Sequence, residues 1–154
     1  HIIENILAAL DRKKYKQIDV VCGSYYMDYE SLCEKYSGEE NVIMHKAIKN
    51  IEEYMINADV AIAAGGTTLY ELCAVGTPSI SFSFADNQLD NVLEFSSEGI
   101  IDYAGDVRND NILDNILKYL DGFSKEKRYE QSRKMQTLVD GLGAMRIANE
   151  LLKF

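Results

Sequence analysis

The sequence lacks several features that would assign it to a special class of protein. Tryptophan is absent and proline occurs only once, so no proline-rich linker interrupts the 154 residues. Lys and Arg number 16 against 25 Asp and Glu, and the net charge of −9 argues against a nucleic-acid-binding surface. No apolar run approaches the roughly 18 residues of a membrane span, and no basic region precedes an apolar stretch as in a signal peptide. We therefore expect a cytoplasmic protein that has no transmembrane segment.

Cysteine is also scarce and its spacing is uninformative for metal binding. Cys22, Cys33 and Cys73 are odd in number and form no C-x-x-C pair. They predict free, mostly buried thiols rather than a disulfide framework or a zinc site. The sequence offers no H-E-x-x-H segment and no compact set of carboxylates. We expect neither a metal nor a cofactor.

Short apolar runs alternate with amphipathic stretches along the whole chain. Such runs predict strands that helices cover on both faces, at Asp19–Gly23, Asn41–His45, Asp59–Ala63, Ser79–Phe84 and Ile100–Tyr103. Helical spacing of apolar residues predicts helices at 2–10, Tyr29–Tyr36, Ile48–Ile56, Thr68–Val75, Leu89–Ser97, 113–120, Glu126–Val139 and Ala144–Leu152. Strict alternation predicts an α/β protein with a three-layer, doubly wound parallel sheet. The length and the absence of a linker predict a single domain over residues 1–154.

The most informative segment follows the third expected strand. Ligands of open α/β sheets bind outside the carboxyl ends of the strands, and here the strand runs into Gly65, Gly66, Thr67 and Thr68 before a helix begins. Glycines let a ligand approach the backbone closely, and a helix start presents unpaired N–H groups with partial positive charge. These features predict a phosphate site without Lys or Arg, which suits a chain of net charge −9.

A second interpretation of the same residues needs no ligand. Thr68 and Glu71 have the spacing of a capping box, in which the Thr caps the helix and the Glu reaches back to it. Gly65 and Gly66 would then form only a tight turn between strand and helix. The four residues alone leave both interpretations open.

A longer pattern carries a family resemblance. The run from Gly65 through Gly-Gly-Thr-Thr-Leu-Tyr-Glu-Leu to Ala-Val-Gly-Thr-Pro-Ser-Ile80, followed by Ala85-Asp-Asn-Gln88, resembles the nucleotide-sugar signature of GT-B proteins. More narrowly, it is similar to the C-terminal half of the UDP-sugar hydrolases of pseudaminic acid biosynthesis and their spore-coat polysaccharide relatives, which are related to MurG-type glycosyltransferases. The segment from Asp140 to Ile147 resembles their closing D-G-x-G-A-x-R-I helix start. The resemblance implies the Rossmann-like C-terminal half of a GT-B fold.

The resemblance also implies roles for single residues. The backbone around Ile48 would hold the uracil edge, and Glu71 would accept hydrogen bonds from both ribose hydroxyls, as an ionised carboxylate can. Asn87 and Gln88 would reach the sugar. The diphosphate would lie on Gly65, Gly66, Thr67 and Thr68. Apart from the resemblance, Asn87 and Gln88 could be ordinary polar loop residues, Asp86 a helix cap and His45 a structural residue.

The family pattern extends beyond the residues present here. Its C-terminal half begins with a strand that is missing from this sequence and that would lie between the strands at Asp19 and Asp59. We expect upstream residues to supply it, because a gap would leave two rows of backbone groups unpaired; direct pairing of Val20 with Ala61 would exclude this. The N-terminal half, which carries the catalytic groups in the family, is missing too. We therefore predict no catalytic residue in this chain and an N-terminal catalytic domain, in the same chain or a separate subunit, as its partner.

Three functions fit these observations. In the first, the chain is the UDP-binding part of a UDP-sugar hydrolase of the pseudaminic type, with UDP or a UDP-sugar as its ligand. In the second, it is the donor-binding domain of a GT-B glycosyltransferase, which could consist of two subunits. In the third, it is a nucleotide-binding module without turnover. The fold cannot distinguish them, because the chemistry depends on the site.

Overall fold

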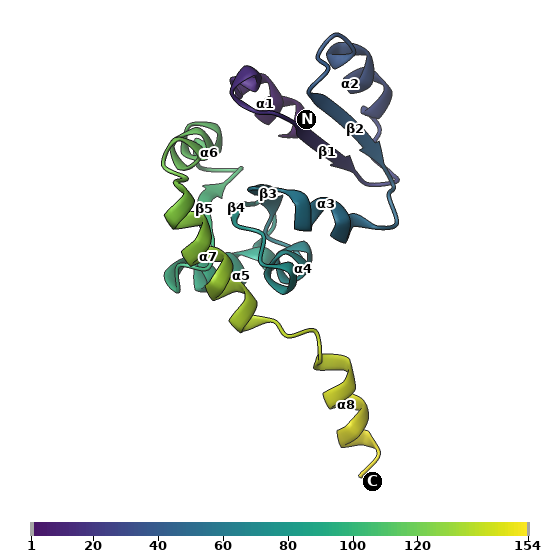
Figure 1. The fold of residues 1–154 in the computed structure, drawn as a ribbon, viewed down its shortest axis with the longest axis vertical. Helices are drawn as coiled ribbons and strands as arrows, with labels where there is room; N and C mark the ends of the chain where they lie inside the picture. Colours follow the sequence, from purple (N-terminus) through teal and green to yellow (C-terminus); the bar gives the residue numbers. More distant parts are fainter. Residues whose placement is uncertain (1, 154) are drawn as a thin grey trace. The chain divides into compact units, whose positions relative to one another are not determined.

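The computed structural model describes residues 2–153, and its chain forms two compact units that meet in sequence between Tyr54 and Met55. Each of the five expected strands is present, and every strand pair is parallel (Figure 1). The structure thus confirms the α/β class, with its parallel strands divided between a two-stranded and a three-stranded sheet.

The first unit contains the two-stranded sheet. Its elements are α1 (Ile2–Ala9), the 3₁₀ turn η1 (Arg12–Lys14), β1 (Ile18–Cys22), α2 (Tyr29–Tyr36), β2 (Val42–Lys46) and the first part of α3 (Ile51–Asn57). β1 and β2 run side by side from Ile18 opposite Val42 to Cys22 opposite Lys46. The core side chains come from the strands and from α1 and α2, and comprise Leu7, Val20, Cys22, Leu32, Tyr36 and Val42.

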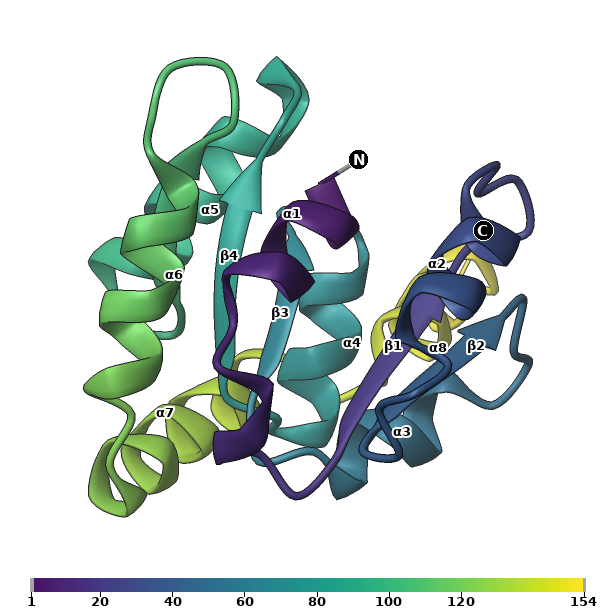
Figure 2. The ribbon, with the colours of Figure 1, turned by 90° about the horizontal axis from the view of Figure 1, so that it is seen from above.

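The second unit contains the three-stranded sheet in the order β3-β4-β5. Its elements are β3 (Ala61–Ala64), α4 (Thr68–Val75), β4 (Ser79–Ser83), α5 (Asp86–Ser97), β5 (Asp102–Asp106), α6 (Ile112–Asp121), α7 (Lys125–Leu138) and α8 (Gly143–Leu151). α4 packs beside β3 and α5 against β4 (Figure 2). α6 packs against β5. The carboxyl ends of β3 and β4 therefore lie next to the starts of α4 and α5.

The central strand β4 is fully buried, although three of its five residues are serines. Each serine hydroxyl has a partner inside the protein. Ser79 bonds to the Thr77 carbonyl, Ser81 to the Ala63 carbonyl, and Ser83 to the Tyr103 hydroxyl at 2.6 Å. Because a buried hydroxyl is costly only when it lacks a partner, the strand tolerates this composition in the middle of the sheet.

Four predicted starts were wrong by two or three residues. β3 begins at Ala61 rather than Asp59. α3 begins at Ile51 rather than Ile48, because Ala47 has a left-handed backbone with φ of 52° that interrupts the chain after β2. α5 begins at Asp86 rather than Leu89, since its polar first turn does not contribute to the apolar spacing. β5 begins at Asp102 rather than Ile100, and a register irregularity displaces its second half against β4.

The strand partners of Val20 and Ala61 test the expectation that an upstream strand lies between them. Val20 pairs with Met44, and Ala61 pairs with Ser79. Within residues 2–153, no strand pair joins β1 to β3. The outcome that would have excluded an additional strand is therefore not observed, and the strand itself stays a prediction.

The cysteines and helix lengths add two findings. Cys22 and Cys73 are buried and Cys33 is half-buried, and all three are free thiols as predicted. Burial raises the pKa of Cys73 to about 11, so this thiol stays protonated at neutral pH. Among the helices described here, none has both the length and the apolar character needed to cross a membrane.

Candidate functional site

The two glycines after β3 have different reasons to be glycine. Gly65 donates its N–H to the Phe82 carbonyl at 2.8 Å, which continues the pairing of β3 with β4. A Cβ at Gly65 would stand only 2.2 Å from Cγ1 of Val92, a fully buried residue of α5. The fold therefore requires the absence of a side chain at this position.

Gly66 has no such requirement. Its N–H turns back to the Ala64 carbonyl at 2.8 Å, and a Cβ built on it would meet no atom within 4 Å. Its backbone is not in the left-handed region that favours glycine. Neither packing nor conformation explains this glycine, whereas the approach of a ligand to the backbone would.

The start of α4 excludes the capping-box interpretation. Thr67, not Thr68, is the N-cap residue, and it makes no side-chain cap hydrogen bond. A capping side chain needs an extended N-cap backbone, whereas Thr67 is already helical with φ of −59° and ψ of −26°. Thr68 lies inside the helix. The prediction that Thr68 caps α4 with Glu71 reaching back is wrong.

The same geometry leaves backbone donors at the start of α4. The first N–H groups with acceptors belong to Leu69, which donates to the Gly66 carbonyl at 3.1 Å, and Tyr70, which donates to the Thr67 carbonyl at 3.0 Å. The N–H groups of Thr67 and Thr68 have no acceptor among the described residues. Unpaired donors at a helix N-terminus, with the positive end of the helix dipole, are suited to an anion.

Glu71 lies one turn into α4 and is exposed. In the described part of the chain, its carboxylate takes part in no hydrogen bond or ion pair. The neighbouring Tyr70 is anchored: its ring packs edge-on against Phe95, and its hydroxyl donates to Asn91 at 3.2 Å. The fold thus fixes the helix but assigns no structural task to the Glu71 side chain.

The predicted sugar residues lie in the first turn of α5. Asn87 is exposed, whereas Gln88 is buried and its Oε1 accepts the Phe84 N–H at 3.0 Å. The interpretation of Gln88 as an ordinary polar loop residue is therefore wrong. A Cβ at Gly65 would lie 3.5 Å from Cβ of Gln88, so the structure brings the glycine loop and this turn together.

Asp86 is not the cap of α5, contrary to one expectation. Ala85 holds the cap position, and Asp86 is the first helical residue. Its carboxylate forms an ion pair with Arg108 at 2.7 Å. Arg108 in turn bonds Asp106 through Nε at 2.9 Å and Nη2 at 2.6 Å.

Sequence reasoning missed Asp106 and Arg108, because no motif marks them. Asp106 ends β5 opposite Ser83, where the register irregularity of β5 places it, and its side chain is buried. Gly105 makes the irregularity possible, since its φ of 114° disfavours other residues. The Arg108 side chain, followed by the Arg108 backbone N–H, lowers the pKa of Asp106 to about 2.

This pKa predicts how the stability depends on pH. Because the folded-state pKa of about 2 lies below the ordinary value of 3.8, the ionised Asp106 stabilises the fold above about pH 4, and its contribution is lost as the pH falls toward 2. We expect Asp106→Asn to lower the free energy of unfolding at pH 6 and to lower it less at pH 3. Urea unfolding of both proteins at the two pH values measures this. An equal loss at both would contradict it.

Ile48 belongs to the first unit. After β2, the Ala47 N–H donates to the Cys22 carbonyl at 2.9 Å, and the chain continues without regular structure to Asn50. Ile48 is half-buried, and neither its N–H nor its carbonyl bonds to another backbone group in the residues described. Its main chain is therefore able to bond to a ligand, as the predicted uracil contact requires.

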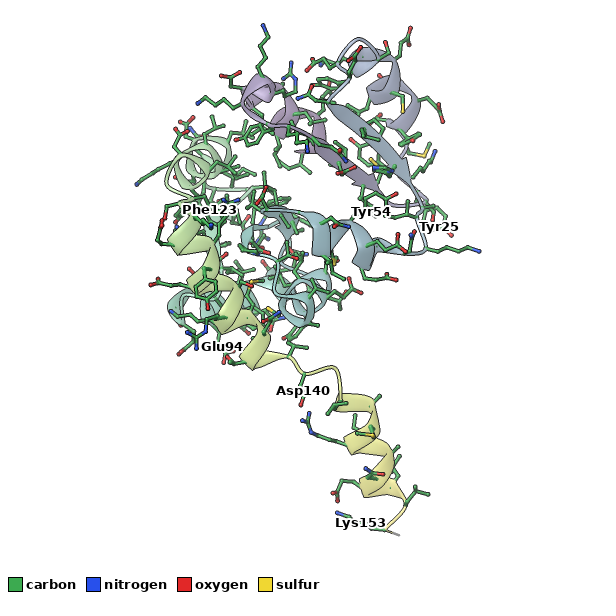
Figure 3. The ribbon with its side chains drawn as sticks, in the orientation of Figure 1. Tyr25, Tyr54, Glu94, Phe123, Asp140 and Lys153 are labelled. Carbon is green, nitrogen blue, oxygen red and sulfur yellow. The ribbon has the colours of Figure 1, made fainter. Side chains whose placement is uncertain are left out.

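His45 and the closing motif have structural partners. His45 Nε2 lies 2.8 Å from Asp19 Oδ1, and its ring contacts Tyr54 with centroids 4.5 Å apart. Asp140, at the turn before α8 (Figure 3), accepts the Leu142 N–H and pairs with Arg146. In residues 2–153, no three His, Cys, Asp or Glu side chains gather as a metal-ligand set.

Comparison with known proteins identifies similar sequences and a similar fold. The sequence model of the glycosyltransferase family 28 C-terminal domain matches residues 1–147. The chain is 24% identical over 152 residues to the spore coat polysaccharide biosynthesis protein SpsG of Bacillus subtilis (strain 168), covering 95% of the chain and 44% of that protein. It is 23% identical over 133 residues to the UDP-N-acetylglucosamine--N-acetylmuramyl-(pentapeptide) pyrophosphoryl-undecaprenol N-acetylglucosamine transferase of Lactococcus lactis subsp. cremoris (strain MG1363), covering 82% of the chain and 37% of that protein.

A solved structure shares the fold. The crystal structure of MurG from Acinetobacter baumannii superposes with a TM-score of 0.77 at 14% identity, over 99% of this chain and 48% of that chain. The chain spans less than half the length of each of these relatives.

Proposed function

Because the chain belongs to the glycosyltransferase family 28 C-terminal domains, we propose that it is the UDP-binding half of an enzyme that releases UDP from a UDP-linked amino sugar. The proposal includes a partner domain on the N-terminal side, in the same polypeptide or another, since the relatives are more than twice as long as the matched region. We place the enzyme in the cytoplasm, where free thiols such as Cys22, Cys33 and Cys73 stay reduced.

One observation carries the proposal: the unpaired N–H groups of Thr67 and Thr68 at the start of α4, beside a glycine that the fold does not require. A diphosphate would accept from these donors and lie against the open backbone of Gly66. The charge of −9 repels an anion at long range, so local backbone donors are the means of binding that remains.

The other contacts follow from chemistry that suits each group of the ligand. Glu71 carries a carboxylate that has no partner among the described residues, and it matches the two neighbouring hydroxyl donors of a ribose. Asn87 is exposed, and the amide nitrogen of Gln88 is not used by the Phe84 bond, so both offer hydrogen bonds to a sugar. The main chain at Ile48 would read the uracil edge.

The proposed reaction is hydrolysis. Water attacks the anomeric carbon of the sugar, the bond from that carbon to the β-phosphate oxygen breaks, and UDP leaves with the bonding electron pair. This chain would hold the leaving group, while the partner domain would supply the group that activates water. The choice of hydrolysis rests on the resemblance of the motifs from Gly65 to Gln88 and from Asp140 to Ile147 to UDP-sugar hydrolases. The similarity to a spore coat polysaccharide biosynthesis protein over 95% of the chain supports a role in polysaccharide synthesis.

A second candidate is glycosyl transfer, in which an acceptor hydroxyl replaces water. The names of the family and of the Lactococcus lactis relative favour it. The two candidates differ in whether UDP release requires an acceptor. Incubating the complete protein with a UDP-sugar alone and measuring UDP separates them: release without an acceptor supports the hydrolase, and release only with an added acceptor supports the transferase.

The nucleotide preference gives a direct test of the binding site. We expect UDP to bind about tenfold more tightly than ADP, because one or two main-chain hydrogen bonds at Ile48 would fit only the pyrimidine edge. Isothermal titration calorimetry with UDP, ADP and GDP measures the three affinities. Equal affinities would remove the uracil contact, and no binding of any diphosphate would remove the proposed function.

A further inference from the structure

An ion-pair chain links the end of β5 to the first turn of α5. Asp106 bonds two nitrogens of Arg108, and a third nitrogen, Nη1, lies 2.7 Å from Asp86. Asp86 immediately precedes Asn87, which the proposed function assigns to the sugar. Arg108 lies in the turn after β5 and contacts Asp86, the residue next to a proposed ligand contact.

The protein holds the two carboxylates that flank Arg108 to different degrees. Asp106 is buried and also accepts the Arg108 backbone N–H at 2.9 Å, and the Asp106 N–H donates to Asp110 at 2.7 Å. The Asp86 side chain is 84% exposed, and its ion-pair partner among the described residues is Arg108. The buried carboxylate thus fixes the guanidinium, and the guanidinium holds the exposed turn.

We infer that Arg108 is a positioning residue for the sugar part of the donor site, an inference that rests on the proposed function. Gln88 is fixed by its own bond to the Phe84 backbone, whereas Asn87 has no protein partner among the described residues. The direction of the Asn87 side chain depends on the backbone of the first turn, which Arg108 ties to β5 through Asp86.

Arg108 itself is poorly suited to bind the phosphates. Nε and Nη2 are directed at Asp106 and Nη1 at Asp86, so two carboxylates share its single charge. An arginine neutralised in this way attracts a further anion weakly, whereas its geometry restrains both partners in a planar fork. Its effect on binding should therefore pass through Asn87 to the sugar and leave the nucleotide unaffected.

The experiment compares two ligands that differ only in the sugar. The affinities of UDP and UDP-N-acetylglucosamine are measured by calorimetry for the full 154-residue chain, for Arg108→Met and for Asp86→Asn. We expect each variant to bind UDP-N-acetylglucosamine about threefold to tenfold more weakly, as for the loss of one sugar hydrogen bond, with UDP affinity unchanged. Arg108→Lys should restore part of the loss, and the double variant should lose no more than either single one.

The matched control is another arginine on the second unit. Arg128 pairs with Asp59 at 2.5 Å, and the Asp59 side chain is 84% exposed, as that of Asp86 is. Arg128→Met removes the same charge and the same kind of pair, and should change neither affinity.

The outcomes separate this inference from the proposed function. A selective loss for the sugar nucleotide in Arg108→Met and Asp86→Asn supports positioning. If the wild type binds UDP but the variants lose both ligands equally, or lose neither, the inference is overturned while the proposed function stands. If the wild type binds no UDP, the result contradicts both the inference about Arg108 and the proposed function. Should Arg108→Met fail to fold, Asp86→Asn decides, since it changes an exposed side chain.

Discussion

Replacing Glu71 with Gln is expected to weaken UDP binding by about tenfold to a hundredfold. The change turns one acceptor oxygen into an NH₂ donor that faces a ribose hydroxyl, and a lost charge-assisted hydrogen bond costs on the order of 1.5–3 kcal/mol. Glu71 has no hydrogen bond or ion pair within the described structure, and no capping box forms at the start of α4. The melting temperature without ligand should therefore stay the same. Calorimetry and thermal unfolding of both proteins measure the two quantities.

The control for this experiment is Glu94→Gln on α5 (Figure 3). Glu94 is exposed like Glu71, and its substitution changes the net charge by the same amount. A general effect of charge on an anionic ligand would appear in both variants. An unchanged UDP affinity in Glu71→Gln, with unchanged stability, would remove the ribose contact.

The glycine pair is expected to separate stability from binding. Gly65→Ala would drive a methyl group against Val92 and should lower the free energy of unfolding by about 1–3 kcal/mol, as overpacking of a core does. Gly66→Ala adds its methyl group in open space, so the fold should lose little. If the diphosphate lies against this backbone, the same methyl group should weaken UDP binding by about tenfold or more.

Urea unfolding and calorimetry on both variants test this pair, and each variant is the control for the other. A Gly66→Ala protein of normal stability that binds UDP as tightly as the wild type would show that the ligand does not approach Gly66. A Gly65→Ala protein as stable as the wild type would show that Val92 moves aside. The Gly65 result concerns stability and the Gly66 result concerns ligand binding, so either prediction can be wrong while the other holds.

The family and the fold class were both accessible from the sequence. The alternation of apolar runs and amphipathic stretches predicted five parallel strands, because a strand buried on both faces needs a continuous apolar run. β4 illustrates a limit of this argument, since its three serines are as buried as its apolar residues. The order of motifs from Gly65 to Gln88, and again from Asp140 to Ile147, carried the resemblance that the comparisons confirmed at the level of the family.

The sequence by itself determined where we propose the site, because strand ends, glycines and a helix start are local features of consecutive residues. Only the tertiary structure decided what each residue does there. Gly65 is required by Val92 and Gly66 is not, Gln88 holds the Phe84 backbone, and Thr67 rather than Thr68 begins α4. The partners of Arg108 lie on two separate elements that only the folding of β5 beside β4 brings within reach. A local pattern cannot report such contacts, since they depend on which distant residues the packed chain places side by side.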